Sequence, residues 1–312
     1  MSKPAILVLR PLLVDARQSE LEATYEVHRL DTAPDPDALL REVAPRIAAV
    51  VTDGHKGLTA AQIDGLPALR LVASSSAGLE GIDRAALRAR GIPLTNPAPA
   101  LADEVADVAM MLLLAAWKNL PALERHVRSG DWADGEFPLG RALRGRTLGI
   151  LGLGTIGTAI ARRAEAFGLE IAYTTRHPKD VPYPHEPDLV RLAERSDILM
   201  VVVPGGAETK NMVSTAVLAA LGPEGVLVNV ARGSVVDEPA LIEALEAGRL
   251  GGAGLDVMWN EPQPDPRLTR LPNVVLTPHI GSATRDTRDA MSKMVLDNIA
   301  AHFAGTPLLS PV

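Results

Sequence analysis

Short apolar runs alternate with helix-like segments along most of the chain, and this alternation limits the possible folds more than any other feature. In the first third the apolar runs lie at 5–9, 25–28, 47–51, 69–73 and 92–94, and the helical patterns between them at 16–21, 37–43, 59–63 and 83–89. Strands that alternate with helices predict a parallel sheet with crossover helices.

A second series of the same kind begins at Thr147. Its expected strands are 147–152, 170–173, 198–203, 226–230, 252–257 and 274–277, with helices at 155–167 and about 284–303. Continuous Val, Ile and Leu runs suit parallel strands covered on both faces. Between the two series, Pro97 and Pro99 predict a break before a long apolar helix at about 102–117. We therefore predict an α/β protein with two parallel-sheet domains of the Rossmann or flavodoxin-like kind.

Composition excludes several classes of protein. The 312 residues include no Cys, so a disulfide framework and a Cys-ligated metal site are impossible, and a cytoplasmic location is expected. A net charge of −7 and 3% aromatic residues argue against a nucleic-acid partner. The longest clean apolar run, 108–117, is much shorter than the roughly 18 residues of a membrane span. No pair of the seven His residues has the spacing of a metal site, so no metal is expected.

Residues 152–157, Gly-Leu-Gly-Thr-Ile-Gly, match the G-x-G-x-x-G dinucleotide fingerprint between an expected strand and an expected helix. Gly152 permits the tight turn, Gly154 lets the backbone approach a pyrophosphate, and Gly157 lets the helix pack close to the strand. The helix start, with Thr155 and Ile156, then presents amides to the phosphates. The alternative is a glycine-rich turn without a ligand.

The end of the next expected strand favours NADP(H) over NAD(H). An NAD site usually places Asp or Glu there to bind the ribose 2′-hydroxyl. Residues 171–177 contain no acid, and Thr174, Thr175 and Arg176 stand at that position. An Arg can pair with a 2′-phosphate, and a hydroxyl can donate a hydrogen bond to it. For Arg176 alone, the alternative is a solvated surface side chain.

Three later strand ends each supply one polar side chain: Arg232, Glu261 and His279. The carboxyl ends of parallel strands line the ligand crevice, so these groups can converge. Arg can hold the carboxylate of a 2-keto acid, and His can protonate its carbonyl oxygen as hydride arrives. Glu bonded to the His favours the protonated imidazole. Taken singly, each residue could have a structural role.

These motifs occur in order with VADVAMMLLLA (105–115), SDILMVVVP (196–204), NVARGSVVDEPAL (229–241), GRLGGAGLDV (248–257) and TPHIGSAT (277–284). Over essentially its whole length the chain resembles the D-isomer-specific 2-hydroxyacid dehydrogenase family. The resemblance implies that Arg232, Glu261 and His279 are catalytic. It also implies a substrate loop formed by Ser76, Ala77 and Gly78, which binds substrate together with Arg232 and His279. Further cofactor contacts implied by the resemblance are Val203, Pro204, Thr209, Val230, Ala231, Asp256, Gly281 and Ser282.

Some details resemble the glyoxylate/hydroxypyruvate and hydroxyphenylpyruvate reductase branch, which generally uses NADPH. These are the strand end Tyr173 to Arg176, GPEGVLVNVARG (222–233) and SSAGLEGID (75–83). Two stretches depart from the family pattern. Residues 77–80 replace the common V-G-x-D of the substrate loop, which leaves the substrate size open, and 205–207 replace the common Leu-Thr-Pro.

From these features we expect a discontinuous substrate-binding domain at 1–99 plus 284–312, a dinucleotide-binding domain at 100–283, and an active site in the cleft between them. The expected reaction is the NADPH-dependent reduction of a small 2-keto acid, glyoxylate or hydroxypyruvate, to the (R)-2-hydroxy acid. An aryl-pyruvate reductase and a non-catalytic nucleotide-sensing module are the alternatives. The resemblance also implies a homodimer that forms through helix 102–117 and the segment after it, although this helix could equally be buried within one subunit.

Overall fold

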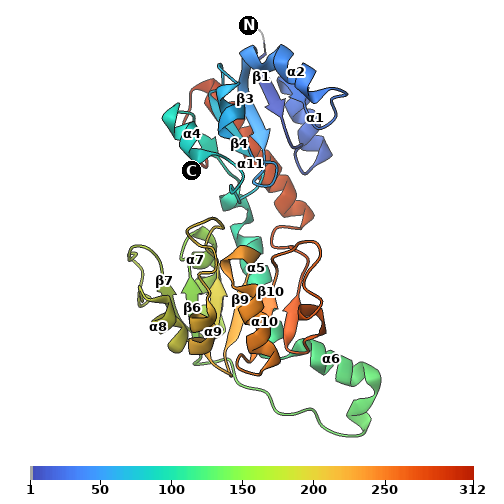
Figure 1. Ribbon diagram of the computed structural model, residues 1–312, viewed down its shortest axis with the longest axis vertical. Coiled ribbons are helices and arrows are strands. Elements are labelled where there is room, and N and C mark those ends of the chain that lie inside the picture. Colours follow the sequence, from blue (N-terminus) through green and yellow to red (C-terminus); the bar gives the residue numbers. More distant parts are fainter. Residues whose placement is uncertain (1–2) are drawn as a thin grey trace. The chain divides into compact units, whose positions relative to one another are not determined.

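The computed structural model describes residues 3–312 and contains two compact units. Met1–Leu101 and Ser282–Val312 form the first unit, of which Met1 and Ser2 lie outside the described residues, and Ala102–Gly281 form the second. Each unit has one parallel β-sheet with helices packed on it (Figure 1). The predicted fold class, an α/β protein with two parallel-sheet domains, is confirmed.

The first unit has a five-stranded sheet in the order β2-β1-β3-β4-β5, which is the flavodoxin-like order. Its strands are β1 (Ala5–Val8), β2 (Glu26–Arg29), β3 (Ile47–Thr52), β4 (Leu71–Ser74) and β5 (Leu94–Thr95). Its helices are α1 (Asp15–Thr24), α2 (Pro36–Val43), α3 (Ala60–Asp64), α4 (Arg84–Ala89) and α11 (Arg285–Ala304).

Alternate residues of β1 supply two cores on opposite faces of this sheet. Ile6 and Val8 pack with α1 and with Ile299 of the C-terminal helix α11, whereas Leu7 packs on the side of α2, α3 and α4. Arg17 on α1 also donates two hydrogen bonds, of 2.8 and 2.9 Å, to the carboxylate of Asp289 on α11. The last helix of the chain therefore completes the first unit.

The second unit has a six-stranded sheet in the order β11-β10-β9-β8-β6-β7. Its strands are β6 (Thr147–Leu151), β7 (Glu170–Thr174), β8 (Ile198–Val201), β9 (Val226–Asn229), β10 (Gly252–Leu255) and β11 (Val274–Leu276). Its helices include α6 (Leu120–Ser129), α7 (Thr155–Ala166), α8 (Leu189–Glu194), α9 (Thr215–Leu221) and α10 (Glu238–Glu246). The chain passes from β6 to β7 on one side and then to β8 on the other, and α/β sheets bind ligands at such a switch point.

The long apolar helix α5 (Ala98–Trp117) begins before the predicted start near residue 102. The expectation that Pro99 lies in a break outside the helix is wrong, because Pro99 lies in the first turn of α5. Amides in the first turn of a helix have no intrahelical partner, so a proline there loses no hydrogen bond. Farther along, Ala106, Leu112 and Leu113 are fully buried in the core of the second unit.

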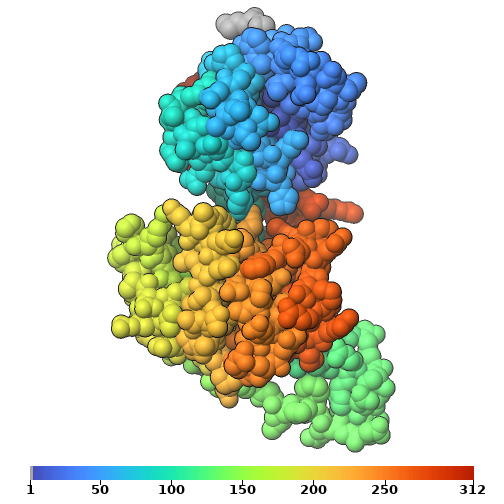
Figure 2. All heavy atoms as spheres, viewed as in Figure 1, coloured from blue at the N-terminus to red at the C-terminus, as the bar shows by residue number. Residues whose placement is uncertain are grey.

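The segment after α5 forms a projection from the second unit, shown in green in Figures 1 and 2. Its helix α6 contains no buried residue. Large apolar side chains on this segment are exposed, among them Trp132 at 65% and Leu139 at 99%. Across residues 3–312, no helix combines the length and apolar character that crossing a membrane requires.

Candidate active site

The fingerprint turn between β6 and α7 has three glycines in three different environments. Gly152 has a φ of +101°, which L side chains rarely adopt. At Gly157 a Cβ would lie 2.2 Å from the carbonyl oxygen of Gly152, so only glycine allows the helix to approach the strand this closely. A Cβ at Gly154 would meet no heavy atom within 4 Å, and the space there is open.

This turn fits a nucleotide pyrophosphate. Gly154 and Thr155 are exposed at the point where α7 begins, and Ile156 is partly exposed. The first amides of a helix have no backbone acceptor, and the helix dipole places positive charge there. Open space beside Gly154 and reachable amides are what a phosphate needs at this position.

The segment after β7 is held in place by buried Tyr173. The Tyr173 hydroxyl accepts a 2.8 Å hydrogen bond from the Lys179 amide, and Thr174 beside it is also buried. The Thr175 hydroxyl donates to the carbonyl of His177 at 2.6 Å. The Arg176 side chain is 87% exposed, and Nη1 lies 3.6 Å from a carboxylate oxygen of Glu208.

The loop after β8 lies against the fingerprint turn. A Cβ at Gly152 would be 2.8 Å from Cγ1 of Val203, so these two segments are in close contact. The Thr209 hydroxyl donates to the carbonyl of Pro204 at 2.7 Å and thereby closes the loop. Glu208, which faces Arg176, belongs to the same loop.

The loop after β9 carries Arg232 and is shaped by buried Asn229. The Asn229 side chain accepts a hydrogen bond from the Ala231 amide and donates one to the Arg232 carbonyl. Val230 lies between these bonds, with its amide donating to Val201 at 3.3 Å. The Arg232 guanidinium donates to the Ala231 carbonyl at 2.7 Å. Sequence reasoning did not assign Asn229 a role, although it lies in the quoted NVARG motif.

The loop after β11 is fixed by the carboxylate of Asp256, which is 1% exposed. One Asp256 oxygen accepts from the Thr277 hydroxyl at 2.6 Å and from the Ile280 amide at 2.8 Å. The other oxygen accepts from the Gly281 amide at 2.9 Å. Between these contacts His279 has a φ of +54°, in the left-handed region. Asp256 therefore sets the backbone from which the imidazole projects.

Glu261 and His279 form a close pair. Nδ1 of His279 lies 2.7 Å from Oε2 of Glu261, while Oε1 of Glu261 accepts from the Met258 amide at 3.0 Å. The hydrogen bond to Glu261 raises the pKa of His279, although burial and the charge of Arg232 lower it. Burial raises the pKa of Glu261, but its bonds to His279 and Met258 and the charge of Arg232 bring it below the ordinary value. An ionised Glu261 beside a readily protonated His279 is the result.

The three predicted residues lie on loops that follow three neighbouring strands, so these loops share one edge of the sheet, and the charge of Arg232 lowers the pKa of both His279 and Glu261. The edge is the carboxyl end, because the three loops follow β9, β10 and β11. This arrangement combines a guanidinium, an imidazole whose pKa is raised and a carboxylate bonded to that imidazole.

The predicted substrate loop and Ser282 belong to the first unit. The Ser76 hydroxyl donates to the Gly78 carbonyl at 2.8 Å and accepts from the Gly54 amide at 2.9 Å. The Ala77 carbonyl accepts from the side chain of Asn96 at 3.1 Å. These bonds give the loop a defined shape within its own unit.

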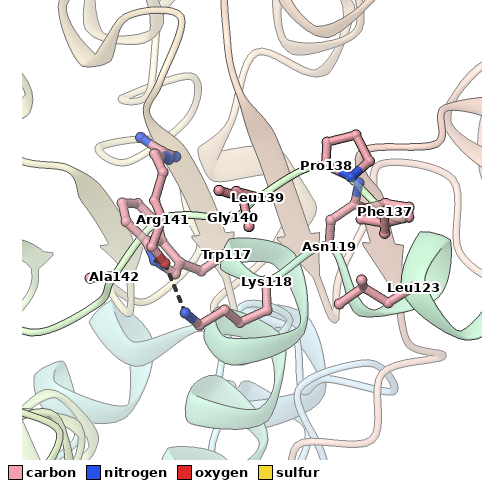
Figure 3. Close-up of a pocket in the computed structure, with 10 residues that line it drawn as sticks. All are labelled: Trp117, Lys118, Asn119, Leu123, Phe137, Pro138, Leu139, Gly140, Arg141 and Ala142. Carbon is pink, nitrogen blue, oxygen red and sulfur yellow. Dashed lines mark hydrogen bonds between the residues drawn. The ribbon is translucent and has the colours of Figure 1, made fainter. Parts of the chain in front are cut away.

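One pocket of the second unit lies at the C-terminal end of α5, where Trp117, Lys118 and Arg141 are among the residues that line it (Figure 3). Lys118 and Trp117 both donate to the carbonyl of Arg141 there, and the Arg141 guanidinium stacks 4.0 Å from the Trp117 ring centroid. Arg232, Glu261 and His279 do not line this pocket.

Comparison with known proteins agrees with the fold and identifies the family. The family model for the NAD-binding domain of D-isomer specific 2-hydroxyacid dehydrogenases matches residues 110–281. The chain is 46% identical over 296 residues to glyoxylate/hydroxypyruvate reductase A of Arabidopsis thaliana, with 95% of each protein covered. It is 42% identical to hydroxyphenylpyruvate reductase of Plectranthus scutellarioides, with 100% of each covered.

A solved structure of a reductase has the same fold over the whole chain. The NADPH-dependent glyoxylate/hydroxypyruvate reductase of Sinorhizobium meliloti, in complex with NADP and malonate, has a TM-score of 0.87 and 42% identity, with 100% of this chain and 97% of that chain covered. Fold, site and comparisons together define an oxidoreductase that uses a nicotinamide dinucleotide. The chain belongs to the D-isomer-specific 2-hydroxyacid dehydrogenase family, and 2-keto acid reduction is the activity its relatives support.

The different surroundings of Gly157 and Gly154 predict different results for the same substitution to alanine. Gly157→Ala should lower the unfolding temperature, because its Cβ collides with the Gly152 carbonyl. Gly154→Ala should leave that temperature within about 2 °C, since the space is open, but should weaken cofactor binding by about tenfold or more. Thermal unfolding and a fluorescence titration with NADPH measure the two effects. Equal unfolding temperatures for the two variants would contradict the assignment.

Proposed function

We propose that this enzyme reduces a small 2-keto acid, glyoxylate or hydroxypyruvate, to the (R)-2-hydroxy acid with NADPH. The 2.7 Å pair between His279 and Glu261, beside the charge of Arg232, carries the proposal. The 46% identity to the Arabidopsis reductase supports this substrate class. An aryl-pyruvate substrate is the second candidate, favoured by the 42% identity to the Plectranthus enzyme.

In this proposal Arg232, His279 and Glu261 have different tasks. The bound nicotinamide supplies hydride to the carbonyl carbon of the keto acid. Arg232 binds the substrate carboxylate and polarises the carbonyl group, because its planar fork matches a carboxylate. Protonated His279 gives the proton on Nε2 to the carbonyl oxygen, since Nδ1 is engaged with Glu261. Glu261 keeps the imidazole charged and fixes its orientation.

Removal of the proton donor tests the reaction directly. His279→Ala should lower kcat for glyoxylate reduction by ~10²–10⁴ while the affinity for NADPH stays nearly the same. A lowered kcat together with unchanged NADPH affinity shows that the variant has lost the chemical step and is still folded. The wild-type rates with glyoxylate, hydroxypyruvate, pyruvate and hydroxyphenylpyruvate rank the substrates. Near-normal turnover by His279→Ala would rule out the assigned donor.

The pH dependence tests the Glu261–His279 pair. Reduction needs protonated His279, so kcat should hold at low pH and fall as pH rises through the His279 pKa. Because that pKa is raised, the fall should lie above the ordinary histidine value of about 6.5. Glu261→Gln removes the carboxylate that favours the charged ring, and the fall should move to lower pH. A pH–rate profile of kcat measures the shift, and an unmoved limb would contradict the pair.

The NADPH preference is proposed from the strand end of β7. Arg176 is exposed and able to meet a 2′-phosphate, and the end of β7 carries no acid for a free 2′-hydroxyl. The solved Sinorhizobium relative contains NADP, which agrees with this choice. On binding of NADPH, Arg176 would leave Glu208, which lies 3.6 Å away, and pair with the 2′-phosphate instead.

Arg176→Ala should therefore raise KM for NADPH by about tenfold and leave KM for NADH within about twofold, because only NADPH carries the phosphate. The matched control is Arg249→Ala, which removes the same charge from an exposed position after α10. The control should change neither KM by more than about twofold. Equal losses with both cofactors on removal of Arg176 would show that it does not contact the phosphate.

A homodimer is proposed from the exposed segment after α5. Most apolar residues of α5 are buried in their own unit, so the contact is assigned to α6 and the residues that follow it. Leu120, Val127, Trp132 and Leu139 are between 54 and 99% exposed on this segment. Such an apolar surface is typical of subunit contacts. Sedimentation of the full chain at the mass of a dimer would support this assignment, and a monomer would contradict it.

A further inference from the structure

Glu238, the first residue of α10, has a buried carboxylate for which the reaction above has no use. It is 6% exposed. The start of α10 is already capped by Asp237, whose side chain accepts from the Ala240 amide. Acidic side chains that are fully buried are rare unless they have a partner. The partner of Glu238 therefore indicates what the residue does.

That partner lies in the loop that carries Glu261. Oε2 of Glu238 accepts a 2.7 Å hydrogen bond from the amide of Trp259, two residues before Glu261. The neighbouring amide, that of Met258, donates to Glu261 itself. Two carboxylates thus hold two consecutive amides, one from within the loop and one from α10.

Two further contacts join the same segments. The indole of Trp259 donates to the carbonyl of Val236 at 2.8 Å, just before α10. At Gly233 a Cβ would lie 2.2 Å from the carbonyl carbon and oxygen of Met258, so the loop after β9 presses directly on this backbone. These contacts connect α10 to the loop that carries Glu261. Glu261 in turn bonds to Nδ1 of His279.

We propose that Glu238 is a positioning residue for the Glu261–His279 pair: its carboxylate holds the Trp259 backbone and so keeps Glu261 within hydrogen-bonding distance of His279. The inference rests on the role proposed above for that pair. Misplacement of reacting groups by about 1 Å can cost about 100-fold in rate, so a residue that only shapes the loop can affect turnover.

The charges around Glu238 guide the choice of variants. Burial raises the pKa of Glu238, the Trp259 amide lowers it, and Asp265 and Glu261 raise it further. A glutamine amide has the same length as this side chain and also offers an oxygen acceptor. Glu238→Gln keeps an oxygen for the Trp259 amide, whereas Glu238→Met has similar length and no acceptor.

The decisive measurement is an NMR titration of the His279 ring in the full chain without cofactor, with the signal assigned from its absence in His279→Ala. Groups that act on this ring are Glu261, Arg232 and Asp256, and none is changed in the variants. Wild type and Glu238→Gln should both titrate above about 6.5, and Glu238→Met should titrate nearer to that ordinary value. This readout needs no turnover, so it decides the role of Glu238 even if the wild-type chain reduces no 2-keto acid.

Turnover supplies the second readout. Glu238→Met should lower kcat by about 10- to 100-fold and move the pH–rate limb downward, with KM for the cofactor within about threefold. Glu238→Gln should restore the limb and most of kcat. Glu243→Met, the same change at an exposed position on α10, should leave all values unchanged.

If Glu238→Met does not fold, Glu238→Asp takes its place, since it withdraws the carboxylate by one methylene and should give the same shifts. A folded Glu238→Met or Glu238→Asp protein with a wild-type His279 titration and pH–rate limb would overturn the proposal. A fall in unfolding temperature alone would have the same meaning, because it would assign Glu238 a purely structural role.

Discussion

The arrangement of the site depends on the buried carboxylate of Asp256. It lies at the end of β10, and both of its oxygens accept hydrogen bonds from the loop after β11. A buried carboxyl group is costly unless it is hydrogen-bonded, and here the next loop supplies the bonds, from the Thr277 hydroxyl and the amides of Ile280 and Gly281. The loop that carries His279 is consequently held to the strand whose following loop carries Glu261. Sheet, loops and the Glu261–His279 bond form one connected structure.

Much of this architecture could be predicted from the sequence, because parallel strands buried on both faces leave long apolar runs. The strands were found to within about two residues, and the order of motifs along the chain located the three polar residues on three strand ends. The helices α6, α8, α9 and α10 were not among the expected segments. Three of these helices span fewer than ten residues, and α6 buries none of its residues, so periodicity over such short or solvent-facing stretches is weak.

The candidate site was only partly readable from sequence for a different reason. Arg232, Glu261 and His279 have reactive side chains, and their types point to chemistry. Glu238 accepts from a backbone amide 21 residues away, and Asn229 bonds to an amide and a carbonyl two and three residues further on. Neither residue type by itself indicates such a partner. The positive φ of His279 could not be predicted from the sequence either, because only a small fraction of non-glycine residues adopt it, even though histidine is among those enriched there. Proline was misjudged at Pro99 because its effect depends on its place in the helix.

Because α11 belongs to the first unit, the two units need not fold in the order in which they are synthesised. Val295, Leu296 and Ile299 cover one face of a sheet whose strands are all made in the first third of the chain. Before α11 is synthesised, α1 covers only part of that face, whereas all strands of 102–281 are already available to pair. The unit 102–281 can therefore become native first, and the unit that contains β1–β5 must wait for α11 to emerge from the ribosome.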